Sequence, residues 1–356
     1  MIERRLVPTG RGKLSSAHVQ DDWYVACTSK ALAKKPVSTT LLGVPMVIFR
    51  DDDGQPHALE DRCAHRNVPL SLGRVVGPNL ECPYHGWQFD GEGTCKRVPG
   101  LCGAQEARGR KVPGYATREL DGLVWVYGLA DTAPAREPYR LPNHDDDRYY
   151  TAIDVQEADG TLHAVAENAL DVPHTAFLHR GLFRSDGTRR PIDVVIRRWH
   201  DRVEAQYIGE ERPKGIVGWL LAPGGGEVEH YDRFIMPCVS QVEYKLSEKS
   251  HIIVSAMLSP VDDLRTRLFA AVTFKLPLPA PLVALFLRPI ARFIFHQDAR
   301  MLTHQRENIE RFDGERYLST EIDCLGPHIL RLLRDGERDA RDPMETPVTK
   351  RLQIMV

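Results

Sequence analysis

The pattern of apolar and polar positions divides the chain into two parts. Residues 22–129 alternate short apolar runs with turn residues, which is typical of a small β-domain. Within this part, Leu41–Arg50 predicts a pair of strands, Asp51–Gly54 predicts a turn, and Leu123–Tyr127 predicts a buried strand. The segment Asp131–Pro142, with three prolines and alternating charge, predicts a linker.

After the linker, the periodicity predicts a helix over Leu162–Leu178, then several strands, then a long helix over Arg288–Phe312 and a shorter one over Ile329–Arg334. Helix, sheet and then helix indicate an α+β fold. We expect an all-β domain over residues 20–130 and an α+β domain over residues 131–356, on which residues 1–19 are candidates to pack. The expected strands and hairpin signal are Ile192–Arg197, Val203–Ile208, Gly224–Gly226, Val228–Ile235, Ser240–Leu246 and His251–Leu258.

One apolar segment, Leu276–Phe295, is a candidate membrane span. Its longest uncharged run, Leu276–Leu287, has twelve residues, whereas about 18 are needed to cross a bilayer. Three prolines break its start, and Arg288 and Arg292 interrupt its end. The sequence therefore favours a buried or lid-like segment without a membrane span, and peripheral membrane contact is the alternative.

The amino-acid composition limits the class of protein and the cellular compartment in which it is expected. The 356 residues are 42% hydrophobic and 27% charged, as in globular proteins with room for two cores. The formal net charge of −2 gives no reason to expect nucleic acid or an anionic membrane as partner. Five of the seven cysteines show no paired spacing, which favours a reducing, cytoplasmic location. Met1–Lys13 carries charges but no apolar core, so we do not expect a secretory signal.

The remaining two cysteines belong to a metal-binding pattern. Cys63-Ala-His65 and Cys82-Pro-Tyr-His85 each supply one sulfur and one nitrogen donor, and sixteen residues separate the pairs. Two thiolates can hold one iron of a [2Fe–2S] cluster while two imidazoles hold the other, which raises the potential above that of a four-cysteine ferredoxin. The alternative is a Cys2His2 zinc site, although zinc sites usually cluster like ligands along the chain.

The flanking residues favour the cluster. Cys63–Leu70 and Cys82–Phe89 closely resemble the two cluster-binding loops of Rieske proteins. Asn67 departs from the resemblance, because the family often has glycine there. Asparagine also tolerates a left-handed backbone, so the departure leaves the interpretation intact.

A second metal site is indicated in the other half of the chain. His174 and His179 are five residues apart, so in a regular helix they would not converge, but Pro173 can interrupt a helix between them. Asp298 lies in an apparently apolar stripe of the long helix, where a carboxylate is costly unless it is paired or metal-bound. The structural alternative is a salt bridge with Arg292 or Arg300. That stripe comprises Ile294, Asp298, Met301, Leu302, Gln305, Ile309 and Phe312.

Two histidines and one carboxylate form the facial triad of non-haem Fe(II) oxygenases. The segment Asn168–His179 resembles the mononuclear-iron motif of Rieske non-haem iron oxygenases, and Phe295–Asp298 is similar to their carboxylate segment. The resemblance covers nearly the whole chain and implies a Rieske domain followed by a helix-grip catalytic domain. It implies that His174, His179 and Asp298 bind Fe(II). It also implies that Asp171 bridges to a Rieske histidine of a neighbouring subunit, and that Asn168 lies near the iron.

We expect a terminal oxygenase, an α-only homotrimer, that takes electrons from NAD(P)H through a reductase and a candidate ferredoxin. It would use O2 to hydroxylate or demethylate a hydrophobic small molecule, with desaturation and cis-dihydroxylation as alternatives. A Rieske electron-transfer protein is the alternative from another class, and a ligand-binding domain with a decayed triad is a third. The sequence leaves the substrate and the donor proteins open. Other histidines, such as His163, His200, His230, His296 and His304, are assigned to structure or solvent, with His230 a candidate for the substrate pocket.

Overall fold

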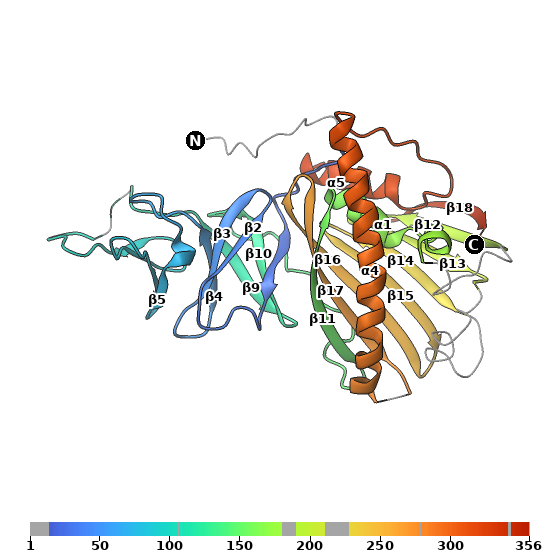
Figure 1. The fold of residues 1–356 in the computed structure, drawn as a ribbon, viewed down its shortest axis with the longest axis horizontal. Coiled ribbons are helices and arrows are strands. Elements are labelled where there is room, and N and C mark those ends of the chain that lie inside the picture. The colour runs from blue at the N-terminus through green and yellow to red at the C-terminus, as the bar shows by residue number, and fades with distance from the viewer. Residues whose placement is uncertain are drawn as a thin grey trace. The chain divides into compact units, whose positions relative to one another are not determined.

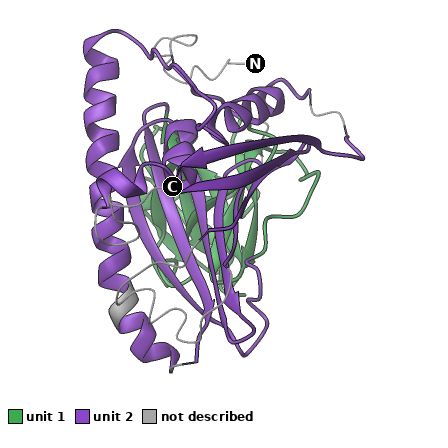
Figure 2. Ribbon diagram, turned by 90° about the vertical axis from the view of Figure 1, so that its right-hand side faces the viewer, with its two compact units in different colours: residues 1–8, 19–140, 259–262 green, residues 9–18, 141–258, 263–356 purple. Residues whose placement is uncertain are grey.

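The chain forms two units, which Figure 2 shows in different colours. The computed structural model describes residues 14–105, 107, 109–179, 190–210, 228–277, 279–340 and 343–355, without the side chains of residues 286 and 287. Among the described residues, unit 1 comprises Val19–Arg140 and Ser259–Asp262, and unit 2 comprises residues 14–18 together with the described parts of Leu141–Leu258 and Asp263–Val356. The predicted hairpin signal Gly224–Gly226 lies outside the described residues.

Unit 1 is an all-β structure of two antiparallel sheets. Its larger sheet has six strands in the order β1-β10-β9-β4-β3-β2, and its smaller sheet has the order β5-β6-β7-β8. The predicted strand pair is present, with Leu42 and Gly43 at positive φ of 51° and 76° in the tight turn. The elements are β1 Trp23–Thr28, β2 Val37–Leu41, β3 Val44–Arg50, β4 Pro56–Glu60, the 3-10 helix η1 Leu70–Leu72, β5 Arg74–Val76, β6 Asn79–Glu81, β7 Gln88–Phe89, β8 Cys95–Arg97, β9 Gly114–Leu120 and β10 Leu123–Ala130.

One apolar core in unit 1 joins the two sheets. Val47 and Phe49 of β3 pack in the same cluster as Leu80 of β6 and Phe89 of β7. The cluster also contains Cys63 and Cys82, which are 1% and 3% exposed, so burial of apolar side chains fixes the backbone from which both cysteines project.

Unit 2 is an eight-stranded antiparallel sheet with helices packed on it (Figure 1). The strand order is β11-β17-β16-β15-β14-β13-β12-β18. Helix α1 packs on β14 and β15, helix α4 packs along β11, and helix α5 packs on α1 and β13. The elements are β11 Tyr150–Asp159, α1 Leu162–Leu170, α2 Thr175–Leu178, β12 Pro191–Arg198, β13 Arg202–Ile208, β14 Glu229–Ile235, β15 Val239–Ser247, β16 Ser250–Asp262, β17 Arg265–Lys275, α4 Ala280–Arg311, α5 Gly326–Glu337 and β18 Val348–Met355.

Helix α4 is longer than the sequence pattern predicts. It begins at Ala280 rather than Arg288, because its N-cap Pro279 and Pro281 in its first turn are compatible with a helix start, and it accommodates Pro289 in its interior. The segment Leu276–Phe295 is therefore mostly helix. Its Val283 and Ala284 are buried, but Leu282, Leu285 and Phe293 are more than half exposed, so the expectation of a buried segment is only partly right.

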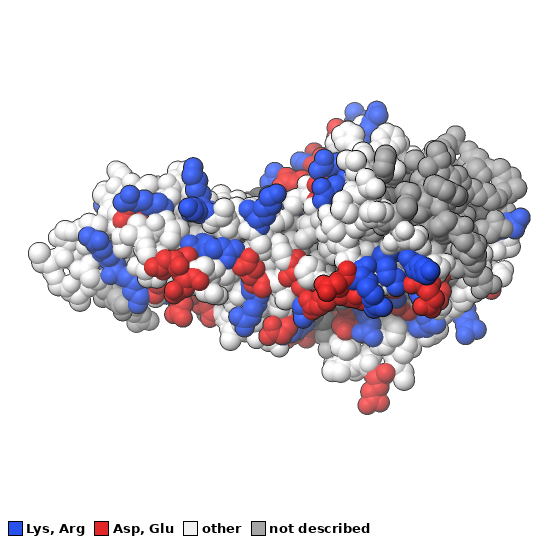
Figure 3. All heavy atoms as spheres, turned by 90° about the horizontal axis from the view of Figure 1, so that it is seen from below, with Lys and Arg blue, Asp and Glu red and all other residues white. Residues whose placement is uncertain are grey.

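No helix among the described residues is both long and apolar enough to cross a membrane. On the face shown in Figure 3, acidic and basic side chains are interspersed, in keeping with a net charge near zero.

Candidate metal centres

The two cysteine–histidine loops of unit 1 have the same backbone design. In each loop the cysteine N–H donates to the carbonyl five residues later, and the N–H four residues later donates back to the cysteine carbonyl. The bonds are Cys63 to Val68 at 2.9 Å, Asn67 to Cys63 at 2.9 Å, Cys82 to Trp87 at 2.8 Å and Gly86 to Cys82 at 3.1 Å.

This design needs a left-handed residue four positions after each cysteine. Asn67 has φ of 62° and Gly86 has φ of 68°. Glycine is unstrained in this region, and asparagine enters it more readily than most residues. The expectation that Asn67 can replace the usual glycine is thus confirmed.

Like donors from the two loops meet. The thiols of Cys63 and Cys82 are neighbouring groups, and the rings of His65 and His85 lie 4.6 Å apart between centroids, at 64°. Each loop therefore contributes one member of a sulfur pair and one member of a nitrogen pair. This arrangement suits two irons, one held by sulfur and the other by nitrogen.

A single zinc ion fits these donors poorly, because four tetrahedral ligand atoms must all lie within about 4 Å of one another. Among the described residues, only one group of three or more ligand atoms lies within 4.8 Å of one another, and it is in unit 2. The four donors of the cysteine–histidine loops do not form such a group.

The surroundings of the donors are apolar on one side and exposed on the other. Burial raises the pKa of the Cys63 thiol to about 11, so this thiol ionises only when metal charge compensates. His65 stacks on Trp87 with centroids 4.8 Å apart, and its buried Nδ1 has no hydrogen-bond partner among the described residues. His85 is exposed. An unpartnered buried nitrogen beside a second imidazole fits an iron ligand.

In unit 2, a break in the chain direction brings two histidines together. The predicted continuous helix Leu162–Leu178 is wrong, because α1 ends at Leu170 and α2 begins at Thr175. Pro173 lies in the turn between them, as the sequence suggested. His174 and His179 are the residues that cap the short helix α2 at its two ends, and the turn lets their side chains converge despite the spacing of five.

Asp298 of α4 completes a triangle with these histidines. The distance from His174 Nε2 to His179 Nε2 is 3.3 Å. Asp298 Oδ1 lies 3.5 Å from His174 Nε2 and 3.1 Å from His179 Nε2. Three ligands at about 2.1 Å and right angles around one ion would be about 3.0 Å apart. The donors and their spacing fit a facial Fe(II) site.

The surroundings of Asp298 also fit a cation. Its Oδ1 is buried and has no hydrogen-bond partner of acceptable geometry among the described residues. The alternative salt bridge with Arg292 is not formed, since Arg292 pairs with Asp154 at 2.9 Å. The predicted apolar stripe is only partly right, because Met301 is 43% exposed and Phe312 is 75% exposed.

Asp171 lies behind His174, on the side away from the triangle. Its Oδ2 is 3.4 Å from His174 Nδ1, while His174 Nε2 faces Asp298. Burial lowers the pKa of His174, but the carboxylates of Asp171 and Asp298 outweigh burial and raise it to about 9. The site therefore attracts positive charge. The contact of Asn168 here is a backbone one, in which its carbonyl accepts from the Asp171 N–H at 3.4 Å.

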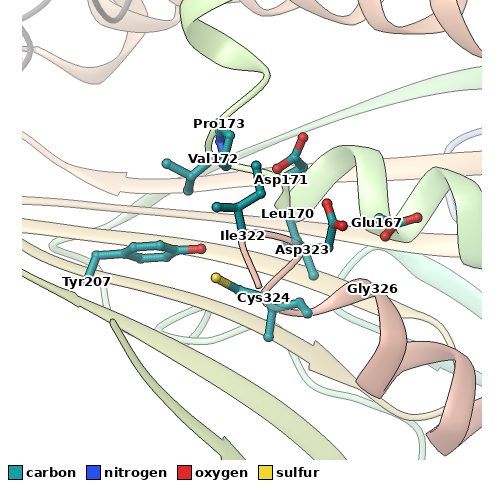
Figure 4. A pocket seen from close by; sticks show the side chains of 11 residues that line it. Glu167, Leu170, Asp171, Val172, Pro173, Tyr207, Ile322, Asp323, Cys324 and Gly326 are labelled. Carbon is teal, nitrogen blue, oxygen red and sulfur yellow. The ribbon is translucent and has the colours of Figure 1, made fainter. Parts of the chain in front are cut away.

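A pocket of unit 2 opens beside Asp171 (Figure 4). Its polar lining includes Glu167, Asp171, Asp323 and Tyr207. Burial and the charges of Asp323, Asp171 and Glu315 raise the pKa of Glu167 to about 7. Sequence reasoning missed Glu167, although it lies one helical turn before Asp171.

Comparison with known proteins agrees with this architecture. The profile of the Rieske [2Fe-2S] domain matches residues 22–108, and that of the vanillate O-demethylase oxygenase C-terminal domain matches residues 158–336. Methylxanthine N1-demethylase NdmA of Pseudomonas putida is 33% identical over 257 residues, which cover 69% of this chain and 70% of the relative. The dicamba O-demethylase oxygenase component of Stenotrophomonas maltophilia is 35% identical over 175 residues, 48% of this chain and 51% of the relative.

The fold agrees as well. The structure of Pseudomonas putida NdmA with caffeine superimposes with a TM-score of 0.77 at 24% identity, over 93% of this chain and 97% of that one. The chain spans about half the length of several of the curated relatives that it matches.

The fold combines a Rieske domain with a helix-grip domain. The chain belongs to the Rieske non-haem iron oxygenases, whose cofactors are a [2Fe–2S] cluster and a mononuclear iron.

Proposed function

We propose that the chain is the terminal oxygenase component of a multicomponent system and oxidises a hydrophobic small organic molecule by hydroxylation or by N- or O-demethylation. When bound, the cluster would supply electrons one at a time and Fe(II) would activate O2. The observation that carries the proposal is the convergence of His174, His179 and Asp298 in a chain that also has the Rieske loops. An electron-transfer protein would need no such triangle.

We assign Cys63, His65, Cys82 and His85 to the cluster, and the triangle of unit 2 to Fe(II). The contact between Asp171 and His174 Nδ1 supports a role for Asp171 in holding that ligand and in linking it to a Rieske histidine of a second copy. Asn168, which caps the same turn through its backbone, would keep Asp171 in place.

A homotrimeric ring would bring one copy's cluster to the next copy's iron, because a head-to-tail interface that closes forms a ring. The surface around the cluster loops supports this. Leu72 and Tyr84 are 70% and 62% exposed there, and the exposed Arg66 adds positive charge, whereas Arg62 and Arg74 pair with Glu60 and Glu81.

The surface around Asp171 has complementary character. Phe177 and Ile322 are 55% and 47% exposed, and Glu167, Asp171 and Asp323 line the adjoining pocket. Apolar side chains with opposite charges on the two surfaces favour docking of one on the other.

The electron donors would be a reductase using NAD(P)H, with or without a ferredoxin. The relatives named as an O-demethylase and an N1-demethylase support demethylation, and the relative named as a 3-chlorobenzoate-3,4-dioxygenase oxygenase subunit keeps cis-dihydroxylation as the alternative. A reducing compartment such as the cytoplasm is supported by the seven cysteines, which are all thiols in the structure.

The test is turnover with a surrogate reductase, NADH and a panel of methylated aromatic and alkaloid compounds. Substrate-dependent O2 consumption should accompany a product heavier by one oxygen, or release of formaldehyde if a methyl group is lost. In the matched Asp298→Ala protein, the cluster should still be reduced but product should vanish. Equal reoxidation of the reduced cluster by O2 in both proteins, with and without any compound, would contradict an oxygenase.

A further inference from the structure

The imidazole of His179 is held at both of its nitrogens by consecutive residues of α4. Asp298 Oδ1 lies 3.1 Å from Nε2, and Gln297 Oε1 lies 2.9 Å from Nδ1. His179 is 2% exposed, so water does not compete for either nitrogen. The two contacts fix the position of the ring in its plane.

The contact between His179 Nδ1 and Gln297 determines which nitrogen of the imidazole can bind a metal. A neutral imidazole has one N–H donor and one lone pair, and only the nitrogen with the lone pair can bind a metal. If Nδ1 carries the hydrogen and donates it to the Gln297 carbonyl oxygen, Nε2 presents its lone pair to the triangle. The other tautomer would place a hydrogen at Nε2 and block binding there.

The two histidines are supported by groups of different charge. The Nδ1 of His174 faces the carboxylate of Asp171 at 3.4 Å, whereas the Nδ1 of His179 faces a neutral amide at 2.9 Å. A carboxylate beside the ring increases its basicity, while an amide oxygen that accepts from Nδ1 selects the tautomer without adding negative charge. Gln297 thus orients the buried His179 ring from the Nδ1 side and selects its tautomer without adding negative charge.

We propose that Gln297 is a positioning residue that keeps His179 in the Nδ1–H tautomer and thereby sets the affinity of the triangle for a divalent cation. This rests on the proposed assignment of His174, His179 and Asp298 as metal ligands. Removing the acceptor should leave the buried ring free to adopt the tautomer that cannot bind. Loss of such an outer contact typically costs 10–100-fold in metal affinity.

The test compares Gln297→Leu, which removes the acceptor, with Gln297→Glu, which keeps an acceptor of similar size. Both are titrated with Fe(II) under anaerobic conditions against a chelator, after the mononuclear metal has been removed and with cluster absorption as the control for folding. Gln297→Leu should bind Fe(II) about 10–100-fold more weakly, and Gln297→Glu should bind at least as tightly as the wild type. The exposed neighbour on α4 provides a matched control, His296→Gln, which should behave as the wild type.

A second measurement detects the hydrogen on His179 Nδ1 directly. In the Co(II)-substituted protein, the His179 Nδ1–H should give a paramagnetically shifted proton signal that exchanges slowly with solvent, and Gln297→Leu should lose it or speed its exchange. Wild-type affinity in Gln297→Leu, or equal losses in the Leu and Glu variants, would overturn the inference. If Asp298→Ala also retains full Fe(II) affinity, the ligand assignment fails instead.

Discussion

Asn67 and Gly86 occupy equivalent positions in the two cysteine–histidine loops and share a left-handed backbone, with φ of 62° and 68°. They differ in the space around them. A Cβ on Gly86 would meet Pro99 Cγ at 3.1 Å, whereas Asn67 is exposed. The same backbone requirement is therefore met by two residues that are not interchangeable.

The first prediction concerns this pair. Asn67→Gly should retain the cluster, while Gly86→Asn should be less stable because its side chain crowds Pro99. Asn67→Val should cost about 1–3 kcal/mol, since a β-branched residue is strained at positive φ. Thermal unfolding and visible absorption per chain measure the effects. Equal behaviour of Asn67→Val and Asn67→Gly would contradict the backbone argument.

The second prediction concerns the cluster ligands. Cys63→Ser or His85→Ala should abolish the visible absorption, because charge transfer from sulfur to iron needs the complete site. Metal analysis of the wild type should find two irons for the cluster and no zinc. Stoichiometric zinc in colourless protein prepared without oxygen would disprove the assignment.

The third prediction concerns the carboxylate of the triangle. Asp298→Ala should lose mononuclear iron and all turnover while the cluster spectrum survives, because the loops lie in unit 1 and Asp298 in unit 2. Iron content and product formation are measured in parallel with Glu307→Ala, an exposed acid of the same helix. If Glu307→Ala fails and Asp298→Ala is fully active, the wrong residue of α4 has been chosen.

The fourth prediction concerns Asp171. Asp171→Asn should keep both metals and the proposed trimer but lose nearly all product, because an amide at that position removes the charged acceptor for a Rieske histidine of the neighbouring copy. Light scattering tests the assembly, iron content tests metal binding, and the yield of a single turnover tests product formation. A monomer with full turnover would rule out the ring, and a fully active Asp171→Asn protein would rule out only the bridge.

The fifth prediction concerns stability against pH. His230 is buried between Glu210 at 2.6 Å and Asp232 at 3.0 Å. Burial lowers its pKa, but the charge of Asp232 and hydrogen bonds to both carboxylates raise it to about 9. The folded state thus holds a proton that the unfolded chain releases near pH 6.5.

Protonation of His230 contributes roughly 3 kcal/mol in all to the free energy of unfolding. This contribution is fully present below about pH 6.5 and is lost as the pH rises through about 9. Urea unfolding of the wild type between pH 6.5 and 9.5 should show the fall. In His304→Ala, an exposed control, the free energy of unfolding should fall with pH as steeply as in the wild type. In His230→Gln it should fall less steeply. A wild-type slope in His230→Gln would contradict the assignment.

The local motifs were predictable, but the long-range partners were less so. The cysteine–histidine loops are short and carry their own backbone requirement at Asn67 and Gly86. The break at Pro173 could be anticipated because proline is a local signal. The residue that joins His174 and His179 could not be found from spacing, since the supposed apolar stripe around Asp298 includes the exposed Met301 and Phe312. Resemblance pointed to Asp298, and the fold places it at the triangle.

Two of the three missed strands of unit 2 share a cause, whereas the third, β17, is an inner strand with buried apolar positions. The edge strands β11 and β18 carry little apolar alternation, and β18 includes the exposed Thr349, Lys350 and Arg351. Such strands are held by backbone pairing with one neighbour, and polar side chains protect the open edge. Periodicity of apolar residues cannot detect them, because only their position in the finished sheet explains their conformation.

The pairing of like donors across the two loops has a consequence for biogenesis. Each iron would be bonded to both loops, so the cluster would act as a double cross-link closing the segment that contains η1, β5 and β6. A cross-link around a segment of this size restricts the unfolded chain by about 3 kcal/mol. Iron and sulfide supply would thereby add to the order that the apolar core gives this part of unit 1, and chains made without them would open this segment to proteases more often.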